Sequence, residues 1–574
     1  MTLSAPHADT PVLSGMFTPK LLTVLREGYT LQHLRADVIA GATVAFVALP
    51  LSMAISIGSG AKPENGLYTS IVGGFLISAL GGSRFQIGGP AAAFITLVAT
   101  TTATYGLQGL MFATMMAGVV MLAIGYCRLG AYVKYIPHPV TIGFTAGIAL
   151  TIAAGQLHDF LGLTLDNEPA AFAPKLQALW GALASVNPAA AAVSALCVAI
   201  FLLMRRLAPK FPGLIAVMAL AAVVVWALKL PVETIGTRFG DVPSLPPLPH
   251  WPDFPIARLP ELVPSAIALA LLGSIESLLS AVVADGMTGR RHRSNCELVA
   301  QGYANIACGL FGGICATGTV ARTATNVRSH AHGPVSGMLH AIFLLFFMMA
   351  AAPLMKLIPL VALAAVLIIV AWNMVERSQI AAILRLDRAE TVVLAATFLL
   401  TLFRDLTSGI VVGVALGSLL FMHRMARSVE VTQNEDFDDD DRDDSQEPRG
   451  PYETSDSDDT LVYRVAGPFF FGAAGTVAEV LERIGQTPKN FIVDFSAVPF
   501  IDVTGVEAMA GVVRKASASG ARVAFAGANA SVASALRLNG MTPDKVDYCA
   551  TVAGARAMTA TAARDGLAKS LPEG

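Results

Sequence analysis

The chain has 574 residues, of which 54% are hydrophobic and 14% are charged, whereas soluble domains carry roughly a quarter charged residues. Most of it is therefore expected to lie in a lipid bilayer. The formal net charge of −2 and a pI near 6.6 argue against a nucleic-acid-binding protein, which would need a concentrated basic surface. The 6 cysteines show no CxxC spacing, so we expect reduced packing residues without a metal site, and no cofactor.

Residues 1–30 are mixed polar and lack the pattern of a cleaved signal peptide, so none is expected. Apolar runs then follow one another from Val38 to about Glu430, and a helix needs roughly 20 such residues to span a bilayer. About fourteen spans are predicted, at residues 38–58, 66–80, 87–103, 109–127, 139–157, 189–204, 213–230, 262–285, 298–311, 318–328, 335–355, 359–375, 391–403 and 406–423.

The basic residues indicate the orientation of these spans, because Lys and Arg collect in short cytoplasmic loops. With a cytoplasmic N-terminus, the inside loops contain Arg84, Arg128, Lys134, Arg205, Arg206, Lys210, Arg290, Arg291, Arg293, Arg385, Arg388, Arg424 and Arg427. Most of the basic residues follow this rule, but Lys356 and Arg404 lie in loops predicted on the opposite, non-cytoplasmic side. An even number of spans returns the C-terminus to the cytoplasm.

The C-terminal part changes character twice. Residues 431–459 are acidic and show no apolar periodicity, which predicts a solvated linker. This linker separates a transmembrane domain at 38–430 from a small domain at 460–574, and a cytoplasmic N-terminal segment at 1–37 precedes the transmembrane domain. That domain is predicted to be α/β, with strands at 461–467, 490–496 and 521–527 and helices at 473–485 and 505–519.

Glu276 lies deep in the apolar stretch ALALLGSIESLLSAVVADG, near the expected bilayer midplane. Ser280 follows one helical turn later on the same face. Ionisable groups are costly in hydrocarbon, so we interpret Glu276 as a substrate-linked or cation-coupling carboxyl group that exchanges a proton near neutral pH. A structural carboxylate bonded to nearby hydroxyl groups is the alternative.

Two short segments, residues 83–97 and 312–326, each pass from extended residues through glycine into a helix. Such breaks at membrane depth need protein or a water-filled cavity around them, and two facing helix N-termini make an anion site. Pro90 suits the first turn of the first half-helix. Gly88, Gly89 and Gly318 would let a ligand approach the backbone, although close helix packing also favours small residues.

Arg322, one turn into the second half-helix, would add a positive charge to this site, or serve as a structural counter-ion, for instance of Glu276. Each half-helix is the third segment of its half of the chain. The positions therefore predict seven plus seven segments of inverted topology.

The run DVIAGATVAFVALPLSMAISIGSGAKPENGLYTS and the segments GGSRFQIGGPAAAF, GSIESLLSAVVADGMTG and FGGICATGTVARTATNVR resemble the sulfate permease (SulP) family of anion transporters over nearly the whole chain. Within it, SNCELVAQGYANI and LIIVAWNM most resemble the bacterial aerobic C4-dicarboxylate transporters. The resemblance implies an α-helical membrane protein of about fourteen segments, a 7+7 inverted repeat with core and gate domains, and substrate bound between segments three and ten.

Carried over residue by residue, the resemblance implies a site lined by Leu51, Ile55, Ala91, Glu276, Ser280, Gly318, Thr319 and Arg322. Together with Gly89 and Pro90 from the broken segment, we assign these residues to substrate binding, except Glu276 and Ser280, which we assign to ion coupling. Sodium-coupled members resemble this chain but have Asp, with Thr one turn later. Glu276 and Ser280 therefore favour a proton over sodium. Leu51 stands where chloride-handling animal members have glutamine, which weakens a halide assignment.

The C-terminal domain resembles the STAS domain of bacterial anti-sigma-factor antagonists. There the loop after the central strand reads Asp-Ser-Ser-Gly with a phosphorylatable serine, whereas FIDVTG has Val503 at that position and keeps a hydroxyl on Thr504. A phosphorylation switch is therefore doubtful. The resemblance instead favours assembly of a homodimer, with a cytoplasmic partner as a further possibility.

Together these observations predict proton-coupled import of C4-dicarboxylates such as succinate or fumarate across the bacterial inner membrane. Bicarbonate or sulfate as substrate would leave the architecture unchanged. An uncoupled anion channel with STAS regulation, or a signalling scaffold, is also compatible with these residues. An enzyme is not expected, because no nucleophile and base stand at plausible spacing.

Overall fold

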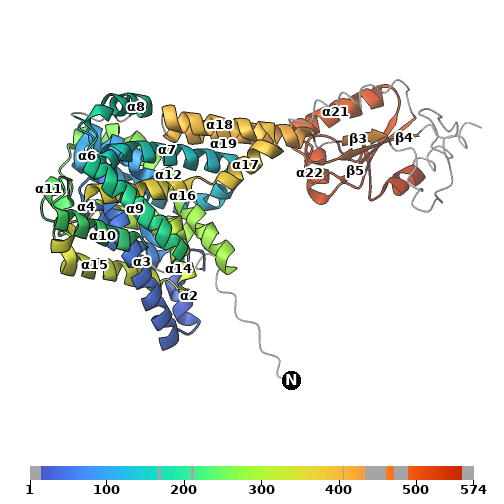
Figure 1. Cartoon of the computed structure of the whole chain (residues 1–574). Coiled ribbons are helices and arrows are strands. Elements are labelled where there is room, and N and C mark those ends of the chain that lie inside the picture. Colours follow the sequence, from blue (N-terminus) through green and yellow to red (C-terminus); the bar gives the residue numbers. More distant parts are fainter. Residues whose placement is uncertain are drawn as a thin grey trace, which may run out of the picture. The chain divides into compact units, whose positions relative to one another are not determined.

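The computed structural model describes residues 15–165, 169, 171–207, 213–404, 406–427, 430–433, 460–470 and 489–558. The chain divides into two compact units, Met1–Gly417 and Ser418–Gly574 (Figure 1). The first unit is helical and the second contains a β-sheet.

The first half of the helical unit contains α2 (Lys20–Arg26), α3 (Leu31–Gly58), α4 (Pro63–Tyr68), the π-helix η1 (Thr69–Gly73), α5 (Gly74–Leu80), α6 (Ile95–Tyr126), α7 (His138–Leu161), α8 (Phe172–Gly181), α9 (Pro188–Leu207) and α10 (Gly213–Leu228). The second half contains α11 (Ile235–Phe239), α12 (Leu259–Thr288), α13 (Ser294–Leu310), α14 (Val320–Arg328), α15 (Val335–Met355), α16 (Leu360–Met374), α17 (Arg377–Leu386), α18 (Arg388–Phe403) and α19 (Leu406–Arg427).

All fourteen predicted segments coincide with helical structure. The third and fourth segments are the two parts of α6, which is interrupted at Gly106 by a non-helical backbone with φ 71° and ψ 176°. The second segment is the run α4–η1–α5. Within the described residues, eight helices are long and apolar enough to cross a membrane. Short segments such as α14 span only part of a bilayer, as a half-helix does.

Two groups of helices can be distinguished by packing. In one, α13 packs along α6, α15 along α3, and α12 against both α6 and α14. In the other, α16 and α18 pack on α7, and α9 packs on α16 and α10. The groups meet where α3 contacts α16 and α10. The expected core and gate arrangement is therefore present in the fold.

The sheet of the second unit has the order β3-β4-β5-β6-β7, with β3 antiparallel and the other neighbours parallel. Its elements are β3 (Glu430–Gln433), β4 (Thr460–Ala466), β5 (Asn490–Ala497), α21 (Val503–Ala518), β6 (Arg522–Ala526), α22 (Ala530–Leu538) and β7 (Asp547–Cys549). Phe491, Phe495 and Phe525 are buried in its core.

The predicted strands and the helix at 505–519 match β4, β5, β6 and α21, while the predicted helix at 473–485 lies outside the described residues. One correction concerns the acidic linker. Its first residues, up to Gln433, form β3, because this backbone pairs with the free edge of β4. Residues 434–459 of the linker also lie outside the described part of the chain. Sequence periodicity did not predict α22 or β7.

Candidate functional site

Two very short strands bring the two broken segments together. β1 (Gly88–Gly89) pairs antiparallel with β2 (Thr317–Gly318), so that Gly88 lies opposite Gly318 and Gly89 opposite Thr317. A helix follows each strand, η2 (Ala92–Phe94) with α6 after the first and α14 after the second. The caps Ala91 and Thr319 are extended, and neither helix start receives a side-chain cap. Two helix N-termini with uncapped N–H groups therefore start beside one another, an arrangement that favours negative charge.

The position of Pro90 corrects one prediction. It does not lie in the first helical turn, because β1 ends at Gly89 and the helix begins only at Ala92, after the extended cap Ala91. Its role is instead that of an acceptor: the carbonyl oxygen of Pro90 lies 3.4 Å from Nη2 of Arg322.

Arg322 is almost completely buried, with 1% of its surface exposed. Nη1 donates to Oγ of Ser70 at 3.1 Å and Nη2 donates to Oγ of Ser52 at 3.1 Å, while the two hydroxyl groups lie 2.8 Å apart. Nε has no hydrogen-bond partner within the described part of the chain. Arg322 and Glu276, both among the described residues, form no ion pair, so the counter-ion interpretation of this pair does not fit the geometry.

Gly89 and Gly318 serve a different purpose from the one predicted. A Cβ at Gly89 would overlap the guanidinium group of Arg322, and a Cβ at Gly318 would overlap the side-chain amide of Gln86. Both glycines therefore make room for polar side chains of the protein itself. The close approach at these glycines is made by Arg322 and Gln86.

Helix α12 presents one face to both strands. The hydroxyl of Thr317 donates to the carbonyl of Gly273 at 3.0 Å. The amide of Gln86 donates to Oγ of Ser277 at 2.8 Å. Ser280 donates to Oγ1 of Thr323 at 3.0 Å, and Thr323 also accepts from the N–H of Ile87 at 3.1 Å. These bonds fix α12 against the site.

Glu276 lies on the same side of α12 as the residues that make these bonds, since it is three or four positions from Gly273 and Ser280. Its side chain is half-buried and forms no hydrogen bond or ion pair with any described residue. Ser280 bonds to Thr323 rather than to Glu276. The alternative of a structural carboxylate bonded to nearby hydroxyls therefore finds no partner in the described residues.

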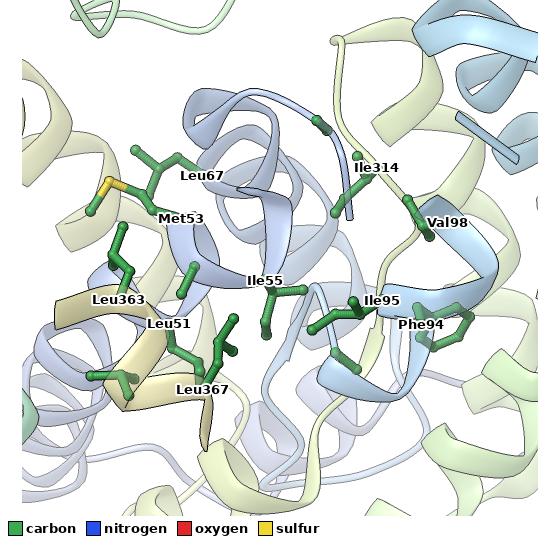
Figure 2. Packing of buried hydrophobic residues seen from close by; sticks show 14 of the residues in the cluster. Leu51, Met53, Ile55, Leu67, Phe94, Ile95, Val98, Ile314, Leu363 and Leu367 are labelled. Atoms are coloured by element: carbon green, nitrogen blue, oxygen red, sulfur yellow. The ribbon is translucent and has the colours of Figure 1, made fainter. Parts of the chain in front are cut away.

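Apolar side chains cover the space beside the two helix starts. Leu51, Ile55 and Ala91 are 7%, 2% and 4% exposed. Figure 2 shows Leu51 and Ile55 of α3 close to Leu367 of α16 and Ile95 of α6. Hydrocarbon from both helix groups thus lies next to the polar centre.

The loops that lead into the two strands are each held by the opposite half of the chain. Glu297 on α13 is fully buried, and its carboxylate accepts from the N–H groups of Gly82 and Ser83 at 2.9 and 3.0 Å, just ahead of β1. In the other direction, Thr69 of η1 accepts from the N–H of Ile314 at 2.7 Å, ahead of β2. The two re-entrant loops are therefore positioned by reciprocal contacts.

Ser52, Ser70, Gln86 and Thr323 belong to this centre, but the sequence pattern did not single them out. Isolated serine and threonine residues are common in membrane helices and often bond to their own backbone. Gln86 had a usable signal, because it is a polar residue directly before the glycine pair of a broken segment. Within the described ranges, no group of three or more His, Cys, Asp or Glu residues could hold a metal ion.

Comparison with known proteins adds a family context. Residues 34–397 match the sulfate permease family, and residues 452–555 match the STAS domain. The putative sulfate transporter YvdB of Bacillus subtilis is 39% identical over 487 residues, covering 84% of this chain and 89% of the relative. The bicarbonate transporter BicA of Picosynechococcus sp. is 30% identical over 497 residues, covering 84% and 87%.

Among solved structures, the inward-facing murine Solute Carrier 26 family member A9 anion transporter superposes with a TM-score of 0.84. The superposition covers 98% of this chain and 96% of that one at 17% sequence identity. A likeness at this identity shows the fold, which is thus that of a membrane transporter with a C-terminal STAS domain.

Proposed function

Since the chain belongs to the sulfate permease family, we propose that it imports small dicarboxylates such as succinate or fumarate together with protons across the bacterial inner membrane. The chain is a multi-pass anion transporter. The relatives named above are transporters as well, in agreement with the expectation of a protein that is not an enzyme.

The main support for an anion site is the buried guanidinium group of Arg322, which lies beside two helix starts without a side-chain cap. Its Nε has no partner among the described residues, and the helices that begin at Ala92 and Val320 have no side-chain cap. A carboxylate bound there would gain charge-assisted hydrogen bonds from Arg322 and from backbone N–H groups. We assign the substrate-binding role to this centre, with Gly89, Pro90, Gly318 and Thr319 shaping its backbone.

The apolar neighbours support an organic anion. Leu51, Ile55 and Ala91 offer hydrocarbon surface to the methylene groups of a dicarboxylate, whereas sulfate and bicarbonate have no apolar part to bury. The resemblance of SNCELVAQGYANI and LIIVAWNM to C4-dicarboxylate transporters supports the same choice. Sulfate and bicarbonate are the second candidates, because the relatives YvdB and BicA carry those substrates in their names.

Glu276 is the proposed coupling group. An ionised carboxylate on this face of α12 repels an incoming dianion, and protonation removes that repulsion. The protonated and ionised states therefore differ in their interaction with substrate, as coupling requires. Ser280 would act indirectly, since its hydroxyl holds Thr323 next to β1. We further assign a homodimeric assembly, cytoplasmic termini and an assembly role for the STAS domain.

Uptake into proteoliposomes tests this function. Labelled succinate, bicarbonate and sulfate are offered to the full-length protein with and without an inward gradient of about one pH unit, which drives about tenfold accumulation per coupled proton. We expect succinate uptake to rise with the gradient. Glu276→Gln should keep succinate exchange but reduce the response to the pH gradient, while Glu261→Gln, at the exposed start of the same helix, should retain both.

If the protein is an uncoupled channel, succinate uptake should change neither with the pH gradient nor after the substitution Glu276→Gln. Gradient-driven uptake of sulfate or bicarbonate without succinate would replace the proposed substrate and leave the coupling argument intact.

A further inference from the structure

His340 on α15 is a buried titratable residue that the proposed mechanism leaves unused. Its side chain is 0% exposed, and neither ring nitrogen has a hydrogen-bond partner among the described residues. One nitrogen of a neutral imidazole donates and the other accepts, and buried polar groups in native proteins are almost always paired, with ordered water where protein does not serve. The imidazole therefore needs a partner that neighbouring side chains do not supply.

The ring lies directly behind β1. A Cβ built on Gly74 of α5 would lie 3.9 Å from Cε1 of His340 and 2.9 Å from the carbonyl oxygen of Gly88. On the other side, α3 approaches so closely that a Cβ on Gly41 would lie 3.1 Å from the backbone nitrogen of His340. His340 is thus enclosed by α3, α5 and α15, with the site strand as its neighbour.

The charged groups around this position are few. Neither η1 (TSIVG) nor α5 (GFLISAL) contains a titratable residue, and His340 is the only one in α15 apart from its C-cap Lys356. The titratable residues of α3 lie in its first two turns, and Asp37 among them already accepts from the N–H groups of His332 and Gly333 and from Tyr29.

Arg322 of α14 and His340 of α15 are connected by packing contacts. Structurally the two are linked through η1 and α5, because Ser70 accepts from Arg322 and lies one helical turn before Gly74. The proposed anion site and the unpartnered imidazole therefore adjoin the same short segment, about one helical turn apart.

We propose that His340, with a bound water molecule, is a second proton-binding group of the transport site, and that proton binding there and anion binding at Arg322 assist each other. The inference rests on the proposed proton-coupled function and deepens it. The imidazole nitrogen takes a proton from water on one side of the membrane and returns it to water on the other.

The coupling follows from charge. Without substrate, a proton on His340 is repelled by the guanidinium of Arg322. A carboxylate bound at Arg322 offsets that repulsion, so the proton binds more readily to the loaded protein. Linkage makes the effect reciprocal, and couplings of this kind typically change affinity by about 5- to 150-fold.

Proton uptake on substrate binding tests the inference with purified full-length protein in weakly buffered detergent solution. Adding succinate at neutral pH should cause proton uptake in the wild type. Uptake should persist in Glu276→Gln, because His340 is intact, and should disappear in Glu276→Gln/His340→Gln. The control is His330→Asn, which replaces an exposed histidine at a positive-φ turn where Asn is well tolerated.

The succinate affinity of Glu276→Gln should also weaken by about fivefold or more from pH 6 to pH 8, and His340→Gln should flatten that dependence. Absence of proton uptake in Glu276→Gln overturns the role of His340, and this result does not depend on whether a His340 variant folds. An unchanged pH dependence after His340→Gln in protein that still exchanges succinate overturns it as well.

Failure of the proposed function has a different signature. Wild-type protein that takes up no proton with succinate, bicarbonate or sulfate, and whose transport ignores a pH gradient, refutes proton coupling as a whole. Proton uptake by the wild type that Glu276→Gln alone abolishes refutes only the second site.

Discussion

Replacement of Arg322 by glutamine removes a buried positive charge that hydrogen bonds hold at the meeting point of β1, β2 and the two helix starts. Coulomb's law gives about 4 kcal/mol for a carboxylate about 4 Å from a guanidinium at an effective dielectric constant of about 20. Desolvation of the anion offsets part of this, so we expect the binding free energy to fall by about 2–3 kcal/mol, or about 30- to 150-fold in Kd.

Arg322→Lys distinguishes charge from geometry. A lysine ammonium keeps the charge but cannot donate to Ser52, Ser70 and an anion in the fixed fork of a guanidinium. We expect its affinity to lie between those of the wild type and Arg322→Gln.

The assay is equilibrium binding of labelled succinate to purified protein, with sulfate and bicarbonate as competitors, and melting temperature as a check on folding. Binding by well-folded Arg322→Gln within about threefold of the wild type would refute the assignment of Arg322 to the anion site.

Three further predictions concern the surroundings of the site. Gly318→Ala forces a methyl group into the amide of Gln86, at a typical overpacking cost of about 1–3 kcal/mol; it should lower both the melting temperature and uptake, and Gln86→Ala in the same chain should restore part of each. Glu297→Ala leaves three buried donors unpaired and should destabilise the fold by about 3 kcal/mol or more, seen as a lower melting temperature that Glu261→Gln does not show. Hydrogen bonding to Arg84 holds the pKa of the Glu27 carboxyl below its usual value of 4.5, so this pair stabilises the protein at neutral pH and loses its effect as the pH falls below about 4.5. Glu27→Gln should therefore melt below the wild type at pH 7, and the difference should vanish in acid; a difference that grows in acid would contradict the pairing.

Much of the fold was predictable because lipid imposes strong rules. Apolar length marked the full spans, and glycine-rich breaks marked the two short segments that contain β1 and β2. The predicted separation of segments 87–103 and 109–127 agrees with the break at Gly106, where the backbone leaves the helical region. In the STAS domain, β3 was missed because EVTQ shows no alternation and forms a strand only through the edge of β4.

The centre of the site was less predictable. Sequence selects Arg322 and Glu276, since charges in apolar segments are conspicuous. It cannot tell that Arg322 bonds to Ser52 and Ser70 rather than to Glu276, because those contacts join residues 270 and 252 positions apart. The place of Pro90 was missed for a similar reason, as pairing with β2 delays the start of the helix.

The pairing of β1 with β2 has a consequence for the synthesis of the protein. The carbonyl of Ile87 finds its partner, the N–H of Thr319, only 232 residues later in the chain. At roughly 5–20 residues per second, translation takes some tens of seconds to cover that distance. During that interval a non-helical backbone segment has reached the membrane without the partner that satisfies it, and hydrocarbon tolerates such a segment poorly. Until β2 has been synthesised, the segment that contains β1 therefore has to be shielded from lipid by protein or water. We expect ribosome-bound chains arrested before β2 to depend most strongly on the insertion machinery.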